Sequence, residues 1–198
     1  MDLGATLFSA GWASGINAYA TVALLGVLGR AGVGEVPEQL QSDAVIAVAS
    51  VMYLIEFVTD KIPYVDNLWD AVHTVVRPAI ASAIGGVYGV DANLDKLDEA
   101  FAVGGSGVTA LASHTVKAAL RLGVNTSPEP ASNIIVSLGE DIAVAGVTVL
   151  IVENPEVAAA IAAALLILGI TTVLFIARRI KRGLRRLQQR RRGPPVPS

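Results

Sequence analysis

The sequence predicts an all-α polytopic membrane protein with about six transmembrane helices in two inverted three-helix repeats. Its composition is the first observation: 53% of the 198 residues are hydrophobic and 16% are charged, whereas soluble domains carry about 25% charged residues. The second is a pair of uncharged runs, residues 3–29 and 157–177, each long enough for a span of roughly 20 residues. The third is an unequal charge distribution between the expected sides of the membrane.

The first and last helices are defined most clearly. Residues 3–30 and 155–178 contain the two uncharged runs, and Asn154 followed by Pro155 is typical of a helix start. Four shorter apolar stretches between them become long enough to cross when a few ionisable residues are included. We therefore expect helices over residues 3–30, 44–62, 66–90, 99–123, 131–152 and 155–178.

The loop charges predict the orientation. An even number of spans places both termini on one side, with the connections 31–43, 91–98 and 153–154 on the other. Those connections contain seven acidic residues and one basic residue, Lys96. The positive-inside rule then predicts that both termini are cytoplasmic, in a bacterial inner membrane.

Two regions follow from this pattern, a membrane domain over residues 1–177 and a basic cytoplasmic tail over residues 178–198. The tail holds nine of the fifteen Lys and Arg residues and no acidic one. It either anchors the topology or binds anionic lipid head groups, at about 1 kcal/mol per basic residue. With a net charge of −2 for the whole chain, nucleic-acid binding is not expected.

A short internal match indicates a duplication, with repeat one at about 1–90 and repeat two at about 96–177. Residues 14–21 align with 106–113 without gaps, and four of the eight positions are identical. Three helices in each unit would make the repeats inverted, as in secondary transporters. Chance similarity between helices rich in small residues is the alternative.

The glycine-rich part of the first helix has two interpretations. Gly11 and Gly15 have the spacing of a close helix contact. Together with Asn17 they could instead mark an unwound helix whose backbone groups bind a solute or ion.

Ionisable residues recur on single helix faces inside the predicted spans. Each would cost about 2.5–3.5 kcal/mol at the bilayer centre, so we expect them to face inward and pair. Asp66 is the exception, because it suits the first turn of a helix. The candidate site for an ion or small charged solute comprises Asn17, Glu56, Asp60, Asp70, His73, Arg77, His114, Lys117, Glu140 and Asp141.

Two roles for this cluster stay open. It could be a lattice of buried ion pairs that fixes helix register, or a water-accessible vestibule for a charged ligand. In the second case Arg77 and Lys117 could hold an anionic group. The acids with His73 could instead hold a divalent cation, although the spacing is specific to no metal. No cofactor is expected.

Four segments carry a family resemblance: GWASGINAY, LIEFVTDKIPYVDNLWDAVHTVVRP, ASHTVKAALRLGVNTSPEP and SNIIVSLGEDIAVAG. In combination they resemble an uncharacterised bacterial membrane family, the domain of unknown function 4126, from about residue 5 to 155. The resemblance implies a multi-pass membrane protein and no particular activity. The basic tail lies outside it.

The sequence favours a small transporter or channel-like protein, with a homo-oligomer expected because six helices leave little room for a private pathway. A membrane scaffold that binds lipids or a partner is the alternative. A membrane-embedded enzyme ranks third, because the chain has no cysteine and lacks the HExxH, GxSxG and Walker A motifs.

Overall fold

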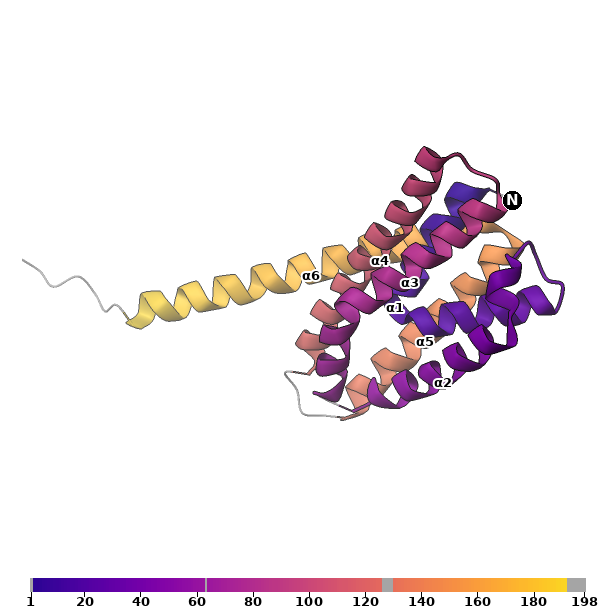
Figure 1. The fold of residues 1–198 in the computed structure, drawn as a ribbon. Coiled ribbons are helices and arrows are strands. Elements are labelled where there is room, and N and C mark those ends of the chain that lie inside the picture. The colour runs from indigo at the N-terminus through magenta and orange to yellow at the C-terminus, as the bar shows by residue number, and fades with distance from the viewer. Residues whose placement is uncertain (1, 63, 126–129, 192–198) are drawn as a thin grey trace, which may run out of the picture.

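The computed structural model describes residues 2–62, 64–125 and 130–191, and the all-α class is confirmed for them (Figure 1). Six α-helices and one short 3-10 helix make up the fold, and no strand occurs among the described residues. The elements are α1 (Leu3–Arg30), η1 (Glu38–Gln41), α2 (Asp43–Thr59), α3 (Val65–Asp91), α4 (Lys96–Val124), α5 (Pro130–Glu153) and α6 (Pro155–Arg191).

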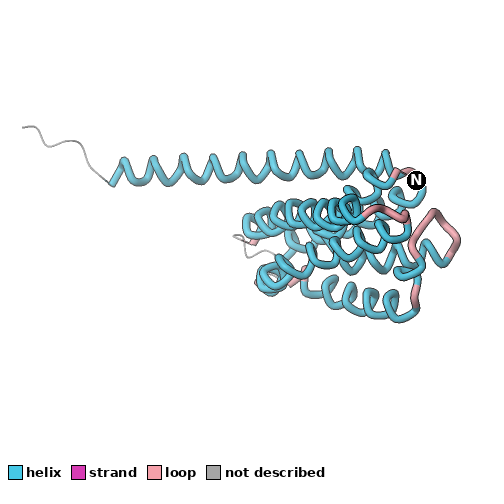
Figure 2. The backbone as a smooth tube through the Cα atoms, turned by 45° about the horizontal axis from the view of Figure 1, so that its top comes forward, coloured by secondary structure: helices cyan, strands magenta, loops and turns pink. Residues whose placement is uncertain are grey.

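The predicted helix boundaries agree with these elements to within a few residues, except at the end of α6. That helix does not end near residue 178 but continues through the basic segment to Arg191, because Arg, Leu and Gln are good helix formers. Its 37 residues correspond to a length of about 55 Å. Figure 2 shows α6 running along the bundle and extending well beyond it. Residues 192–198 of the predicted tail lie outside the described residues.

The helix α1 is broken at Asn17, whose φ of −150° and ψ of 97° are those of an extended residue. Each half is shorter than the roughly 20 residues that a membrane crossing needs. The two halves form a hairpin, since Leu3 at the start of α1 and Glu35 after its end line one cavity with Asp91 and Ala92. The helix therefore enters the bundle, turns at Asn17 and returns to the end from which it started.

The hairpin determines at which end of the bundle the helix connections lie. The connections that follow α1, α3 and α5 all lie at the end of the bundle where the chain begins, and α6 ends at the opposite end (Figure 1). A Cβ added to Gly34 would lie 2.6 Å from the Val152 side chain, which places the end of α5 beside the α1–α2 connection. The first and last ends of the described helices thus lie at opposite ends of the bundle. The expectation that both termini share one side of a membrane assumed a single crossing by α1, and it stays a prediction.

The first half of α1 packs closely along α4. A Cβ added to Gly11 would lie 2.8 Å from the Ser106 carbonyl oxygen, and one added to Gly15 would lie 2.8 Å from Ala110 Cα. These contacts support the packing role of both glycines. The two segments with matching sequences thus lie against each other, and α4 is continuous where α1 is broken. The duplication into inverted repeats stays a prediction.

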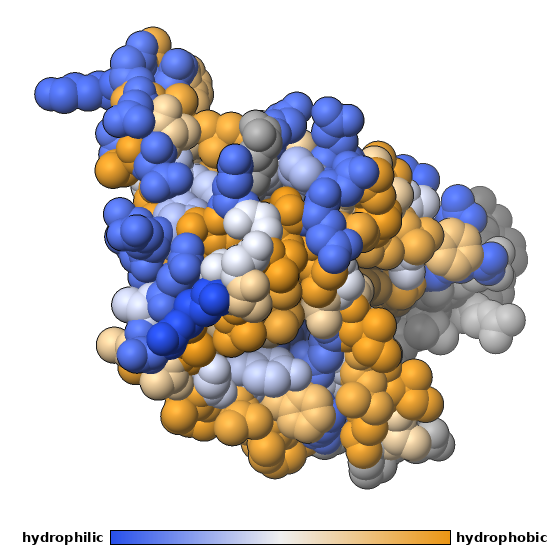
Figure 3. Space-filling view, turned by 90° about the vertical axis from the view of Figure 1, so that its right-hand side faces the viewer, coloured by the Kyte–Doolittle hydropathy of each residue, from blue (hydrophilic) through white to orange (hydrophobic). Residues whose placement is uncertain are grey.

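The outer surface of the bundle is strongly apolar. Large hydrophobic side chains on α2 and α3 are exposed, among them Val48 (65%), Leu68 (70%) and Val75 (74%). By length and composition alone, three helices of the described chain could cross a membrane: Leu3–Arg30, Ala131–Glu153 and Pro155–Arg182. The break at Asn17 divides the first of them into two halves that are each too short to cross. Figure 3 looks onto the end where the chain begins, and hydrophilic residues gather on this face between hydrophobic ones. These features indicate association with a membrane.

Candidate functional site

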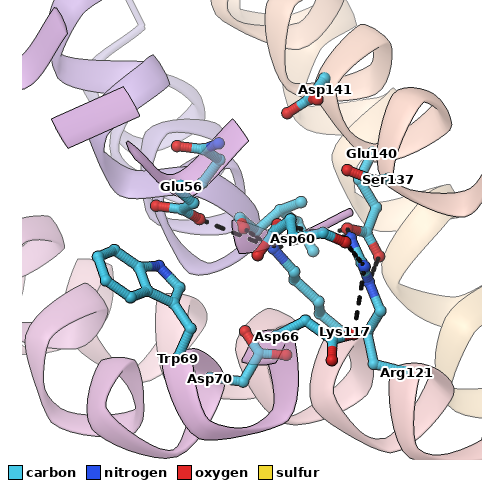
Figure 4. A network of polar contacts seen from close by, with 12 residues as sticks. Glu56, Asp60, Asp66, Trp69, Asp70, Lys117, Arg121, Ser137, Glu140 and Asp141 are labelled. Carbon is cyan, nitrogen blue, oxygen red and sulfur yellow. Dashed lines mark hydrogen bonds and ion pairs between the residues drawn. The ribbon is translucent and has the colours of Figure 1, made fainter. Parts of the chain in front are cut away.

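A network of buried ion pairs lies in the half of the bundle that is remote from the start of α1. Figure 4 shows acidic and basic side chains from α2, α3, α4 and α5 turned toward one another around Asp60, which caps the end of α2. We call this group the central network, and its members are Glu56, Asp60, Asp66, Asp70, Arg77, Lys117, Arg121 and Glu140.

Arg77 joins α3 to α2 and to the tip of α1. Its Nη2 lies 2.7 Å from Glu56 Oε1, and both side chains have no exposed surface. Its Nη1 lies 3.1 Å from Asp70 Oδ1 and donates a 3.3 Å hydrogen bond to the Gly15 carbonyl oxygen. The guanidinium is thereby paired with two carboxylates, the arrangement that a buried cation requires.

Lys117 lies at the centre of the network. Its Nζ is 2.7 Å from Asp60 Oδ2, 3.5 Å from Glu140 Oε2 and 3.7 Å from Glu56 Oε1. It also donates to the Ile16 carbonyl oxygen across 3.0 Å. One ammonium group therefore connects α1, α2, α4 and α5.

Arg121 closes the network toward α5. Nη2 donates to Glu140 Oε2 at 2.5 Å and Nε donates to Oε1 at 3.2 Å, a bidentate contact. Nη1 donates to the Asp60 carbonyl oxygen at 2.6 Å and to Asn133 Oδ1 at 2.9 Å, and it lies 3.4 Å from Asp66 Oδ2. This side chain fixes the turn after α2 against α4 and α5.

The break in α1 supplies acceptors to two of these cations. Gly15 and Ile16 end the first half of α1, so their carbonyl groups lie at the negative end of a helix dipole and are free of helical partners. Arg77 and Lys117 donate to them. The Asn17 side-chain oxygen accepts from the Ala20 N–H at 2.9 Å and caps the second half. The break is thus stabilised on both sides.

Both histidines lie at the edge of the central network. Arg77 Nη1 donates to His114 Nδ1 at 2.6 Å, because a guanidinium can only donate. The single ring proton of His114 is therefore on Nε2, which lies 3.0 Å from the Asp70 carbonyl oxygen. His73 stacks on Trp69 with ring centroids 4.5 Å apart, and its Nε2 pairs with the Tyr19 hydroxyl at 3.0 Å.

Negative charge is in excess in the central network. Five carboxylates face three cations, and the neighbouring pair of Lys61 and Asp141, 3.4 Å apart, adds no net charge. Glu56 Oε2, Asp60 Oδ1 and Asp70 Oδ2 are buried without a hydrogen-bond partner. Asp70 Oδ1 also has no hydrogen bond, although it forms the 3.1 Å ion pair with Arg77. Buried acceptors of this kind are costly, so the site is suited to hold a proton or another cation. In the described part of the chain, no three His or acidic side chains are grouped to hold a metal ion.

A family model described as a domain of unknown function, DUF4126, matches residues 5–174. The chain belongs to the DUF4126 family. No curated protein and no solved structure matches this chain. The matched range includes all of the α1 hairpin except its first two residues and all members of the central network, so the network lies within the body of the DUF4126 domain.

In this DUF4126 chain, most of the residues predicted to form the site lie together. Asp141 pairs with Lys61 beside the network, and Asn17 forms the tip of α1. His73 is the most peripheral, with Tyr19 and Trp69 as its contacts. The others lie in the network or contact it directly: Glu56, Asp60, Asp70, Arg77, His114, Lys117 and Glu140.

Several members of the site were not among the predicted residues. Asp66 does lie in the first turn of α3, as expected, but it also accepts two 2.9 Å hydrogen bonds from Asn125 and faces Arg121. Asn133 donates to the Asp60 carbonyl oxygen. Helical spacing did place Arg121 on the same face as His114 and Lys117, among the charges expected to pair, although it was not a candidate for ligand binding. Nothing in the sequence distinguished the two asparagines from ordinary loop-flanking residues.

The central network is closed rather than an open, wet vestibule. Side-chain exposure is at most 4% for all its members except Glu140, which is 16% exposed. The tip of α1 covers the network from one side, and the turn after α2 covers it from the other. In this conformation the arrangement resembles the predicted lattice of ion pairs, with Glu140 as its accessible edge.

Proposed function

We propose that this DUF4126 protein is a small membrane transporter in which the central network binds a proton or a cation during crossing. The observation that carries the proposal is the contact between a broken, re-entrant helix and a buried network with two unbalanced carboxylates. Interrupted helices and intramembrane charges are both typical of ion and solute pathways.

The proposal includes a membrane orientation. Five helices would cross the membrane and α1 would enter and leave on one side. The end at which α1 begins carries two basic residues, Arg30 and Lys96, whereas the basic segment of α6 belongs to the opposite end. The positive-inside rule then puts the start of α1 outside and the end of α6 in the cytoplasm. The acidic residues of the outer end are Asp2, Glu35, Glu38, Asp43, Asp91, Asp95, Asp98, Glu99, Glu153 and Glu156.

The charge of the network favours a positively charged substrate. Interactions between charges are strong in an interior from which water is excluded. A bound proton or cation reduces the excess of carboxylates, whereas an anion increases it. Movement would require the ion pairs of Lys117 and Arg77 to exchange partners, and both cations already have alternative carboxylates within 4 Å.

A flux assay tests the proposal. The purified protein is reconstituted into liposomes that contain a pH-sensitive dye, a membrane potential is imposed, and proton entry is measured, with rubidium uptake as a parallel readout. We expect flux with the unaltered protein and at least a tenfold loss in Glu56→Gln. The control is Glu153→Gln, because Glu153 is exposed at the acidic end.

Thermal unfolding of the same samples separates the interpretations. Loss of flux in a folded Glu56→Gln protein supports transport. A flux-active Glu56→Gln protein, or an unaltered protein without flux of either ion, contradicts it.

A scaffold role is the second candidate, and α6 favours it. Its outward side chains Ile167, Leu168 and Phe175 are 64%, 62% and 55% exposed, and the helix projects beyond the bundle. A partner could pack on this face. Copurification of a stable complex that is lost when Ile167, Leu168 and Phe175 are replaced by alanine, combined with absence of flux, would support the scaffold.

A further inference from the structure

A lateral cavity of about 270 Å³ adjoins the central network between α1, α4, α5 and α6. Its wall is apolar, and Trp12, Ile16, Val116 and Leu165 are among the lining residues. Two charged residues line it as well, Lys117 and Glu140. The cavity is therefore a hydrophobic chamber with a charged inner side.

Glu140 is the point at which the central network meets this cavity. Its side chain is 16% exposed, whereas Lys117 is 1% and Arg121 is 0% exposed. A molecule in the cavity can thus approach the outer edge of this carboxylate, whose two oxygens accept hydrogen bonds from Arg121.

The cavity adjoins a weakly packed side of the bundle, where α4 hardly contacts α5. Gly139, which lines the cavity, is exposed, and a Cβ added there would meet no atom within 4 Å. Leu138 next to it is 40% exposed. In the proposed orientation this side faces hydrocarbon, so an occupant that enters here needs an apolar body.

The charge of the occupant follows from the network. Five carboxylates face three cations, and Asp60 Oδ1, beside Lys117, has no hydrogen-bond partner. A cationic group near Glu140 reduces this imbalance, and an anionic group increases it. An apolar wall beside a network with excess negative charge favours a ligand that has an apolar body and a positive charge.

We propose that the lateral cavity binds a hydrophobic organic cation, such as a bulky quaternary ammonium or phosphonium ion, with its positive centre toward Glu140. This inference rests on the proposed function in its membrane placement, and it specifies the substrate class of the same site. The cation enters from the bilayer through the opening beside Gly139.

Two ions of nearly the same shape and opposite charge test the inference. Binding of tetraphenylphosphonium and tetraphenylborate is measured by equilibrium dialysis on the full chain in nanodiscs of neutral lipid, with protein-free nanodiscs as the background. We expect saturable binding of tetraphenylphosphonium and at least tenfold weaker binding of tetraphenylborate. Equal binding of both ions, or saturable binding of neither, overturns the inference.

A matched pair of glycine variants locates the site. Gly139→Leu fills the cavity and should weaken tetraphenylphosphonium binding at least tenfold. Gly146 lies on the same helix and does not line the cavity, and a Cβ added there also meets no atom within 4 Å. Binding should therefore be unchanged in Gly146→Leu. Equal effects of the two substitutions place the bound ion elsewhere and overturn the inference.

Removal of the carboxylate tests the charge contact, and Glu140→Gln should weaken binding of the cation and leave that of the borate unchanged. If Glu140→Gln does not fold, the two glycine variants still decide. The binding experiments and the flux assay can fail independently. Proton flux without tetraphenylphosphonium binding refutes only this inference. Tetraphenylphosphonium binding without flux refutes only the transport proposal.

Discussion

Lys117 donates a hydrogen bond to the carbonyl oxygen of Ile16 across 3.0 Å, and these residues are 101 positions apart in the sequence. The acceptor exists because α1 breaks at the next residue, and the tip of α1 contributes to the burial of the donor. The same holds for Arg77 and the Gly15 carbonyl. The helix break and the central network therefore form one structural unit, and disturbance of either should affect the other.

Replacement of Lys117 by Met should destabilise the protein strongly. The substitution leaves Asp60 Oδ2 and the Ile16 carbonyl oxygen without their 2.7 Å and 3.0 Å partners. Removal of one member of a buried ion pair typically costs about 3–5 kcal/mol. Thermal unfolding in mild detergent, followed by circular dichroism, measures the effect.

Two further variants control for the loss of charge as such. Arg30→Met removes the Arg30–Asp43 pair, which is exposed at the bundle surface, and should change the melting temperature little. Addition of Asp60→Asn to Lys117→Met should recover part of the loss, because the uncompensated carboxylate is neutralised. No destabilisation by Lys117→Met would mean that the central network does not hold the helices together.

Asn17→Ala should weaken the α1 hairpin. The side-chain oxygen of Asn17 caps the second half of α1 through the Ala20 N–H, and loss of such a cap costs about 1 kcal/mol. Asn17→Ser retains a capping oxygen and should be close to the unaltered protein. Hydrogen exchange of the amides of residues 18–21 reports on the site directly, and equal protection in both variants would contradict the capping role.

The contact between α1 and α4 makes a clear prediction at Gly15. A Cβ there would collide with the Ser113 hydroxyl and the Ala110 carbonyl and lie 2.8 Å from Ala110 Cα. Gly15→Ala should therefore cost about 1–3 kcal/mol, as overpacking does. In Gly104→Ala the Cβ meets open space, and the protein should be stabilised by up to about 1 kcal/mol, since Ala favours a helix over Gly. A similar effect of both substitutions in an unfolding experiment would refute the close contact.

The limits of the helices were predictable because strong local signals mark them. Asn154 and Pro155 start α6 where a capping residue and a proline predict it, and the acidic connections separate the apolar runs. Helical periodicity also identified the faces that carry the network, since Asp66, Asp70 and Arg77 recur along one side of α3 and all three are buried.

The hairpin was not predictable with the same clarity. Residues 3–29 carry no charge, so length and composition favour one straight span. Gly11, Gly15 and Asn17 indicated an unwound helix only as one of two interpretations. The break at Asn17 is held by contacts with Arg77 and Lys117, which are distant in the sequence. The closed state of the network also depends on contacts between residues that are distant in the sequence. Helical periodicity brings charges to one face, but only the packing of five helices decides whether water reaches them.

Cysteine labelling distinguishes the re-entrant arrangement from a six-span topology. The chain contains no cysteine, so single substitutions can be labelled without background. With α1 as a hairpin, Asp2→Cys and Glu35→Cys lie on the same, outer side, and Lys181→Cys lies on the cytoplasmic side. With α1 as a complete span, Asp2→Cys and Lys181→Cys share a side and Glu35→Cys lies opposite.

A membrane-impermeant maleimide applied to intact cells or spheroplasts gives the readout, with permeabilised cells as the measure of full labelling. We expect Asp2→Cys and Glu35→Cys to react before permeabilisation and Lys181→Cys only after it. All three residues are exposed in the folded chain, so burial does not explain a failure to react. Since Asp2 caps α1 through the Ala5 N–H, Asp2→Cys should also be checked for a normal melting temperature. Labelling of Asp2→Cys together with Lys181→Cys, and not with Glu35→Cys, would show that α1 crosses the membrane and that its two halves do not form a hairpin there.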